Sequence, residues 1–371
     1  MNHFMHPGLA EPRTKEEWRG YLNAVPPTRP HMPPYEIYLT LSDNHRDHLN
    51  DERTDYHSAL VIVRTSQMKK IHRIITRRML TNARQAPGAR RGIVLDGPAT
   101  IGKSTLVKLF AADYERTLRR KHPERYAPRY IVENNLVDYT PVVYLNIPSQ
   151  ATPKDLSLLL AEYMAVHYRT GATKNALTTR VLEEMRLCGT ELVIIDDVHF
   201  LDLSAKEGKV ANDHLKYLAN HTAATFVFTG ADLNTSGLFL EGTGSTRATQ
   251  TSGRNTLVKM TEFPIKTVGE QREWADVIKS MEDSLALYRH RPGSLLKQWK
   301  YLHDRSAGSI CALSDLIRES AIEAILNGEE AITRKLMEEI DISELAQRQY
   351  QETKPKSTKK GQRAAALAVV G

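Results

Sequence analysis

The chain has 371 residues, of which 41% are hydrophobic, 51 are Lys or Arg and 44 are Asp or Glu. This length fits a domain of about 200–250 residues with smaller parts attached, and the apolar content excludes a generally disordered chain. The two cysteines, Cys188 and Cys311, form no C-x-x-C pair, so neither a disulfide framework nor a thiolate metal site is expected. No run of 18 apolar residues occurs, and the N-terminal sequence lacks a signal-peptide core, which predicts a soluble cytoplasmic protein without membrane contact.

The N-terminal third divides into a proline-rich part and a basic part. Residues 1–50 are rich in Pro, His and polar residues and predict an irregular arm. Apolar residues recur at helical spacing between 68 and 79, so residues 55–84 read as one or two helices. From Arg64 to Arg91 nine residues are basic and none is acidic, which is typical of a surface that binds a polyanion or phosphates, or of a solvated helix face.

Strand and helix patterns alternate after residue 91. Short apolar runs end at 97, 148, 196 and 230, amphipathic stretches separate them, and a last strand is expected at 257–265. Continuous apolar strands alternating with helices predict an α/β fold with a parallel sheet covered on both faces. Residues 234–256 read as a long loop, residues 266–345 as an all-helical lid, and the basic tail 346–371 as disordered.

The segment GPATIGKS at 97–104 fits the pattern G-x-x-x-x-G-K-[ST] between a strand and a helix. Its glycines allow a tight turn whose N–H groups surround a phosphate, and the helix N-terminus adds a favourable dipole. Lys103 is expected on the β- and γ-phosphates of ATP and Ser104 on Mg²⁺. The predicted nucleotide-contacting residues are Gly97, Pro98, Ala99, Thr100, Ile101, Gly102, Lys103, Ser104 and Thr105.

A second apolar strand, Leu192 to Ile195, ends in Asp196 and Asp197. A buried strand that delivers an acid to the metal is the usual partner of a phosphate loop, so Asp196 is the expected Mg²⁺ ligand. Successive side chains of an extended strand point to opposite faces, which predicts that the two carboxylates face apart.

These motifs together resemble an AAA+ ATPase, and within that superfamily the TniB/TnsC family of transposition-helper ATPases. The resemblance covers residues 50–345 and rests on DERTDYHSALVIVRT (51–65), RRGIVLDGPATIGKST (90–105), PVVYLNIP (141–148), IIDDVHFL (194–201) and SAGSICALSDLIRESAIEAILNGEEAIT (306–333). It implies a P-loop NTPase core at 51–265, including the basic N-terminal helices, followed by the helical lid.

The resemblance also implies roles for individual residues. Asp197 stands where many relatives carry Glu, and its shorter arm implies slow hydrolysis. Thr229 matches the sensor-1 position, and Arg254 is the first candidate for the arginine finger, with Arg247 second. The sensor-2 position of the lid has no arginine, since that stretch reads AGSICAL after Arg305.

The family further implies a homo-oligomeric ring or filament on double-stranded DNA and a DDE transposase as partner. Lys121, Arg129, Thr152 and Lys154 are the candidate DNA contacts, which would track phosphates with little sequence readout. Two other functions stay open at this point: a replication initiator or helicase loader, disfavoured because no winged helix is evident, and a signalling NTPase scaffold.

Overall fold

The computed structural model describes residues 11–59, 62–86, 90–127, 131–132, 135–201, 207–233 and 255–353. The chain divides into two compact units: residues 1–26 with 64–261, and residues 27–63 with 262–371. Among the described residues, no helix is long and apolar enough to cross a bilayer.

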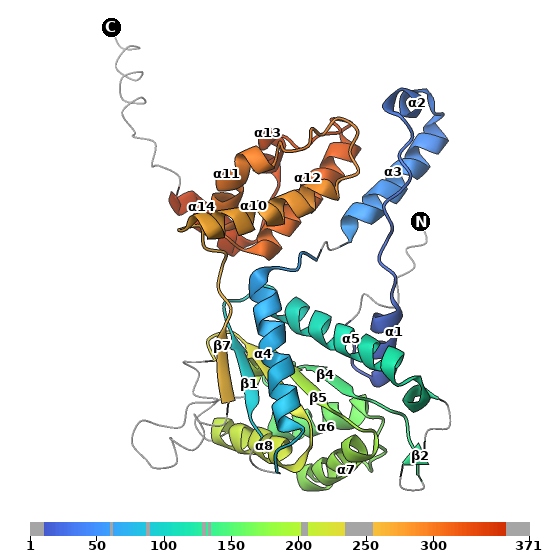
Figure 1. Cartoon of the computed structure of the whole chain (residues 1–371), viewed down its shortest axis with the longest axis vertical. Helices are drawn as coiled ribbons and strands as arrows, with labels where there is room; N and C mark the ends of the chain where they lie inside the picture. Colours follow the sequence, from blue (N-terminus) through green and yellow to red (C-terminus); the bar gives the residue numbers. More distant parts are fainter. Residues whose placement is uncertain are drawn as a thin grey trace. The chain divides into compact units, whose positions relative to one another are not determined.

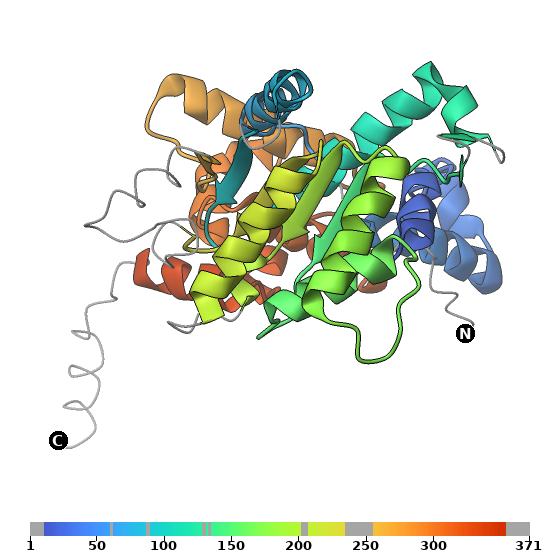
Figure 2. The same ribbon diagram turned by 90° about the horizontal axis from the view of Figure 1, so that it is seen from below.

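The first unit is built on a five-stranded sheet in the order β4-β5-β6-β1-β7, and all its pairs are parallel (Figure 1, Figure 2). Strands β1, β5 and β6 are buried at every position, so both faces of the sheet are covered, as predicted. A short antiparallel pair, β2 with β3, lies outside this sheet. The strands are β1 Gly92–Asp96, β2 Ile131–Val132, β3 Asn135–Leu136, β4 Val142–Asn146, β5 Leu192–Asp196, β6 Thr225–Gly230 and β7 Asn255–Lys259.

The helices of the first unit follow the predicted alternation. Thr152 caps α6 in a capping box with Asp155, and Pro153 occupies the first turn. The helices are α1 Lys15–Asn23, α4 Ser66–Asn82, α5 Lys103–Lys121, α6 Pro153–Tyr163, α7 Lys174–Leu187 and α8 Glu207–His221, with the 3-10 turns η1 Pro123–Tyr126 and η2 Val198–Phe200.

The second unit is entirely helical in its described part. Its core includes four fully buried side chains, Trp274, Leu302, Leu313 and Met337. The helices are α2 Tyr35–Thr40, α3 Asp43–Ser58, α10 Val268–Asp283, α11 Trp299–Ser306, α12 Ile310–Leu326, α13 Arg334–Glu339 and α14 Glu344–Thr353, with the 3-10 turn η3 Leu296–Gln298.

The N-terminal region differs from the predicted irregular arm. Residues 15–58 contain α1, α2 and α3, and α3 packs against α12 rather than joining the sheet domain. The buried face of α3 is Leu49, Arg53 and His57, which recur every four residues but include only one apolar side chain. An apolar pattern therefore did not reveal this helix, and residues 51–63 belong with the C-terminal helices instead of the nucleotide-binding core.

The C-terminal boundary also shifts. Helix α14 covers residues 344–353, so the beginning of the segment predicted to be disordered is helical, with Ala346 and Tyr350 buried. Most of the predicted loop 234–256 and the end of the tail lie outside the described residues.

Candidate nucleotide-binding site

The phosphate loop connects the carboxyl end of β1 to the first residue of α5, as the sequence predicted. Gly102 adopts φ 94° and ψ 21°, a left-handed conformation that glycine reaches without steric cost. A Cβ on Gly97 would lie 2.4 Å from the carbonyl oxygen of Met260, so only glycine fits at the start of the loop. Both loop glycines are therefore required by the backbone itself.

Lys103 turns its ammonium group back over the loop. Nζ donates hydrogen bonds to the carbonyl oxygens of Gly97 (2.9 Å) and Pro98 (2.6 Å). Burial lowers the pKa of Lys103, while the carboxylates of Asp197 and Asp196 oppose that shift. A buried ammonium group satisfied only by loop carbonyls is well placed to exchange these partners for phosphate oxygens.

The remaining loop residues differ in exposure. Pro98, Ala99 and Thr100 are exposed, Ile101 is buried in the sheet core, and Ser104 and Thr105 are half-buried in the first turn of α5. Thr100 also has positive φ, at 58°. The loop is thus exposed at its tip, while Ile101 anchors it in the core.

Asp196 ends β5 with its side chain fully buried. Its Oδ2 accepts a hydrogen bond from the hydroxyl of Tyr144 at 2.7 Å. Its Oδ1 accepts from the hydroxyl of Thr229 and from the N–H of Asp197 (3.1 Å). Burial raises the pKa of Tyr144 and so keeps its hydroxyl protonated as the donor. The carboxylate is therefore held in one orientation by three donors.

Asp197 leaves the strand in a left-handed conformation, with φ 55° and ψ 37°. The prediction that both acids lie on an extended strand was wrong, because β5 ends at Asp196 and the chain turns at Asp197. Burial raises the pKa of Asp197, and the charge of Asp196 raises it further, whereas His199 and Lys103 lower it. Asp197 and Asp196 therefore still repel each other.

Three residues at this site were not found from the sequence. Asp96, buried at the end of β1, accepts the N–H of Leu233 at 2.9 Å and ties the segment after β6 to the phosphate loop. Tyr144 reaches Asp196 from the neighbouring strand. His199 accepts the N–H of Ala231 on Nδ1, 3.9 Å from an oxygen of Asp197. A polar residue at the end of a buried strand was a usable signal for Asp96, and none pointed to Tyr144.

The donor set fits ATP with Mg²⁺. The described residues contain no group of three or more His, Cys, Asp or Glu arranged for a metal. Mg²⁺ is usually bound by one or two protein oxygens, waters and substrate phosphates. Here Asp196 and the hydroxyl of Ser104 would supply the protein oxygens. Bound Mg²⁺ would neutralise charge on the transferring phosphoryl group.

The candidate DNA contacts do not form one surface. Lys121 is exposed at the last residue of α5, about 28 Å along the helix from the phosphate loop. Thr152 and Lys154, also exposed, follow the carboxyl end of β4, the edge of the sheet where α5 begins. The structure therefore places Lys121 at the opposite edge. Arg129, Arg247 and Arg254 lie outside the described residues.

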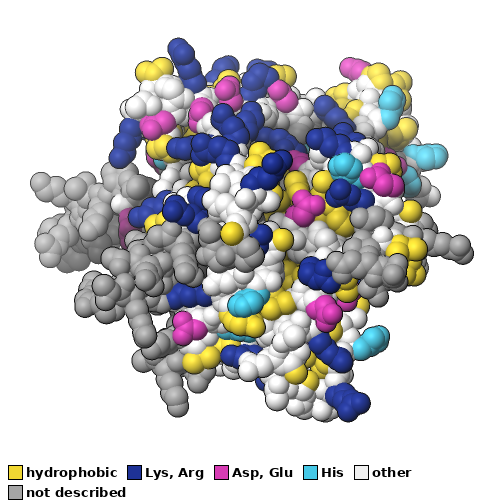
Figure 3. Space-filling model, turned by 60° about the horizontal axis from the view of Figure 1, so that its bottom comes forward, with side chains coloured by type: hydrophobic (Ala, Val, Ile, Leu, Met, Phe, Trp, Pro, Cys, Tyr) yellow, Lys and Arg dark blue, Asp and Glu magenta, His cyan; other side chains and the backbone are white. Residues whose placement is uncertain are grey.

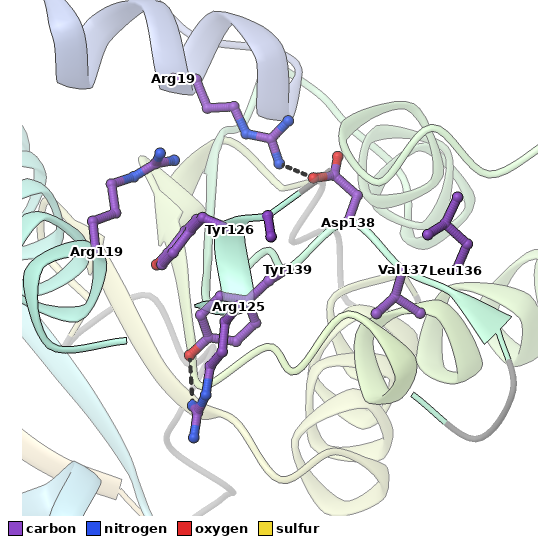
Figure 4. Close-up of a pocket in the computed structure, with 9 residues that line it drawn as sticks. Arg19, Arg119, Arg125, Tyr126, Leu136, Val137, Asp138 and Tyr139 are labelled. Carbon is purple, nitrogen blue, oxygen red and sulfur yellow. Dashed lines mark hydrogen bonds and ion pairs between the residues drawn. The ribbon is translucent and has the colours of Figure 1, made fainter. Parts of the chain in front are cut away.

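A cavity of about 380 Å³ lies near the end of α5, away from the phosphate loop (Figure 4). Its arginines are already engaged: Arg19 pairs with Asp138, Arg119 with Glu115, and Arg125 donates to the hydroxyl of Tyr139. This cavity therefore lacks the open cationic groups of a phosphate site.

Comparison with solved structures supports the same fold. The chain is similar to the Orc1 protein of Aeropyrum pernix, solved in complex with DNA, with 17% identity and a TM-score of 0.51 over 77% of this chain and 66% of that one. It is also similar to Cdc6p of Pyrobaculum aerophilum, with 13% identity and a TM-score of 0.45 over 76% and 72% of the two chains. The chain thus spans just under two thirds of the Orc1 chain. No curated protein matches it.

The topology and the similarity to Orc1 establish the fold as that of an AAA+ ATPase, as predicted. The family model described as "Bacterial TniB protein" matches residues 53–239, half of the chain, and includes both the phosphate loop and the paired acids. The chain belongs to the TniB family of AAA+ ATPases.

Proposed function

We propose that the protein is an ATP-dependent AAA+ regulator that oligomerises on double-stranded DNA and directs a DDE transposase to target DNA. The observation that carries the proposal is the phosphate loop with Lys103 over it and Asp196 fixed beside it, in a chain of the TniB family. ATP binding would favour assembly, and slow hydrolysis would release it.

The slow rate follows from Asp197. Its carboxylate is one methylene shorter than that of Glu, which places it about 1 Å or more further from an attacking water and costs up to about 10²-fold in rate. We assign Asp197 to orienting that water and Thr229 to the γ-phosphate side. In an assembly, Arg254 of a neighbouring copy would supply the positive charge that stabilises the transferring phosphoryl group, with Arg247 as the alternative.

The basic face of α4 supports binding to DNA. Helix α4 carries no acidic residue, and its exposed side chains include Lys69, Arg73 and Arg77, spaced four residues apart on one side. Lys and Arg side chains gather in the upper half of the face shown in Figure 3. We therefore propose this face of α4 as a contact with the phosphate backbone, in addition to the separate candidates Lys121, Arg129, Thr152 and Lys154.

Salt dependence tests the DNA part of the proposal. Each phosphate contact contributes about 0.9 to the slope of log K against log salt, so Arg73→Gln with Arg77→Gln is expected to reduce the slope by about 1.8. The control is Lys279→Gln with Lys335→Gln, which removes two exposed charges that already pair with acids in the second unit. Equal slopes for wild type and the Arg73/Arg77 variant would remove α4 from the DNA surface.

Electron microscopy with duplex DNA and a slowly hydrolysed ATP analogue tests the assembly. Rings or filaments are expected with the wild type and not with Arg254→Ala, and loss of assembly with Arg247→Ala instead would assign the arginine finger to Arg247. The absence of any assembly with the wild type would overturn the oligomeric function. Co-sedimentation of a DDE transposase with the DNA-bound assembly tests the partner.

A further inference from the structure

Tyr144 links the metal-site carboxylate to the N-terminal helix. It lies on β4, its side chain is fully buried, and its hydroxyl donates to Oδ2 of Asp196 on the neighbouring strand β5. The other oxygen of Asp196 has its own donors, Thr229 and the N–H of Asp197. Tyr144 is thus the donor that holds Oδ2.

Helix α1 holds the ring of Tyr144 in turn. The indole of Trp18 stacks on it, with centroids 5.9 Å apart and planes 16° apart, and Nζ of Lys108 lies 5.7 Å from its centroid. Trp18 is 1% exposed, and its Nε1 donates to Oε2 of Glu115 at 2.7 Å. Through Trp18, α1 thus contacts both β4, at Tyr144, and α5, at Glu115, and α5 begins at the phosphate loop.

Polar bonds fasten α1 at both of its ends. Lys15 and Arg19 pair with Asp138, and the guanidinium of Arg116 on α5 donates to the carbonyl oxygen of Leu22. The pairs with Asp138 are partly exposed and therefore weak, so the buried Trp18 contributes most of the attachment. Displacement of α1 would leave one face of the Tyr144 ring uncovered.

We propose that Tyr144 is a positioning residue for Asp196, and that docking of α1 through Trp18 sets how well the site binds Mg²⁺ together with ATP. This inference rests on the proposed ATPase function. Mg²⁺ requires near-ideal octahedral geometry, and loss of an outer partner that orients a metal ligand typically costs 10–100-fold in affinity. A partner that displaces α1 would therefore lower the affinity of the site for Mg²⁺ and ATP.

Tyr163 supplies a matched control. It is also fully buried in the first unit, and its hydroxyl donates to the backbone carbonyl of Val142 at 3.2 Å, at the start of the strand that carries Tyr144. Tyr163→Phe removes a buried hydroxyl without touching Asp196. Both Phe variants should lower the melting temperature, since each leaves one buried acceptor with a donor fewer.

The experiment is a Mg²⁺ titration of the binding of a fluorescent ATP analogue to the full chain. For Tyr144→Phe the Mg²⁺ concentration at half-saturation is expected to rise 10–100-fold, and for Tyr163→Phe to stay at the wild-type value. Trp18→Phe keeps an aromatic ring but loses the bond to Glu115, and it should shift the midpoint in the same direction as Tyr144→Phe.

Three outcomes would overturn the proposal or part of it, and a fourth would overturn the ATPase function. An unchanged midpoint in Tyr144→Phe overturns the positioning role, and an unchanged midpoint in Trp18→Phe alone overturns the control by α1. Equal shifts in the two tyrosine variants would mean that any loss of a buried hydroxyl loosens the site, which also overturns the proposal. If the wild type binds no analogue at any Mg²⁺ concentration, the ATPase function itself fails.

Discussion

Replacing Arg53 by Met should destabilise the second unit strongly. The side chain of Arg53 is fully buried and makes a bidentate pair with Glu330, which is 2% exposed. It also donates to the carbonyl oxygen of Ala286 (3.0 Å) and to Oδ1 of Asn50 (2.9 Å), and its guanidinium carbon lies 4.9 Å from the ring centroid of Tyr288.

The magnitude follows from what Arg53→Met leaves behind. Among the described residues, Glu330 would keep the backbone N–H of Tyr288, at 3.2 Å, as the one donor to its buried carboxylate. Removing one member of a buried ion pair costs about 3–5 kcal/mol, because the other charge stays desolvated. A second change, Glu330→Gln, removes that charge, so the double variant should be more stable than Arg53→Met by about 1–3 kcal/mol.

Urea unfolding followed by tryptophan fluorescence measures the effect, since Trp274 and Trp299 both lie in the second unit. Binding of an ATP analogue reports separately on the first unit, so the two transitions can be distinguished. Arg46→Met is the control: Arg46 pairs with the exposed Asp43 on the same helix and should change stability by less than about 1 kcal/mol. A loss below 1 kcal/mol for Arg53→Met, or a double variant less stable than the single, would refute the reasoning.

Five further outcomes are expected at the nucleotide site. Lys103→Ala should abolish ATP binding in equilibrium dialysis while the circular dichroism spectrum is retained. Asp197→Asn should keep binding and stop phosphate release; in the wild type, turnover should fall with acid at an apparent pKa above that of an ordinary Asp, because burial and Asp196 raise the pKa of Asp197. Thr229→Val removes a charge-assisted hydrogen bond to Asp196 and should cost about 1.5–3 kcal/mol in thermal or urea unfolding. Asp197→Glu should raise turnover if reach limits the rate, and an unchanged or lower rate would contradict that limit.

The sheet and the phosphate loop were predictable because their signals are local. Strand β5 is a continuous apolar run that ends at Asp196, and the spacing from Gly97 to Ser104 fixes both the turn and the start of α5. These features depend only on residues close together in the sequence, so they can be predicted from the sequence pattern.

The N-terminal helices were not predictable in the same way. The face of α3 is buried because Arg53 finds Glu330, a residue 277 positions later, and a polar side chain gives no sign of burial before its partner is known. The same holds for Tyr144, whose role depends on pairing with a strand 52 residues away. The left-handed turn at Asp197 did carry a signal, since Asp tolerates positive φ better than most residues.

The position of Asp197 changes the argument about its short side chain. The charge of the Asp197 carboxylate opposes the burial shift in the pKa of Lys103, so the two groups interact electrostatically. Its pKa is raised, which makes the ionised group a stronger base toward an attacking water. The raised basicity of the Asp197 carboxylate therefore favours hydrolysis, whereas its short side chain slows it. Because the residue also occupies a left-handed backbone conformation, which Asp tolerates better than most residues since its short polar side chain can hydrogen-bond locally, the turn itself favours Asp over Glu. The short reach to which we attribute slow turnover would then be linked to the way the chain leaves β5.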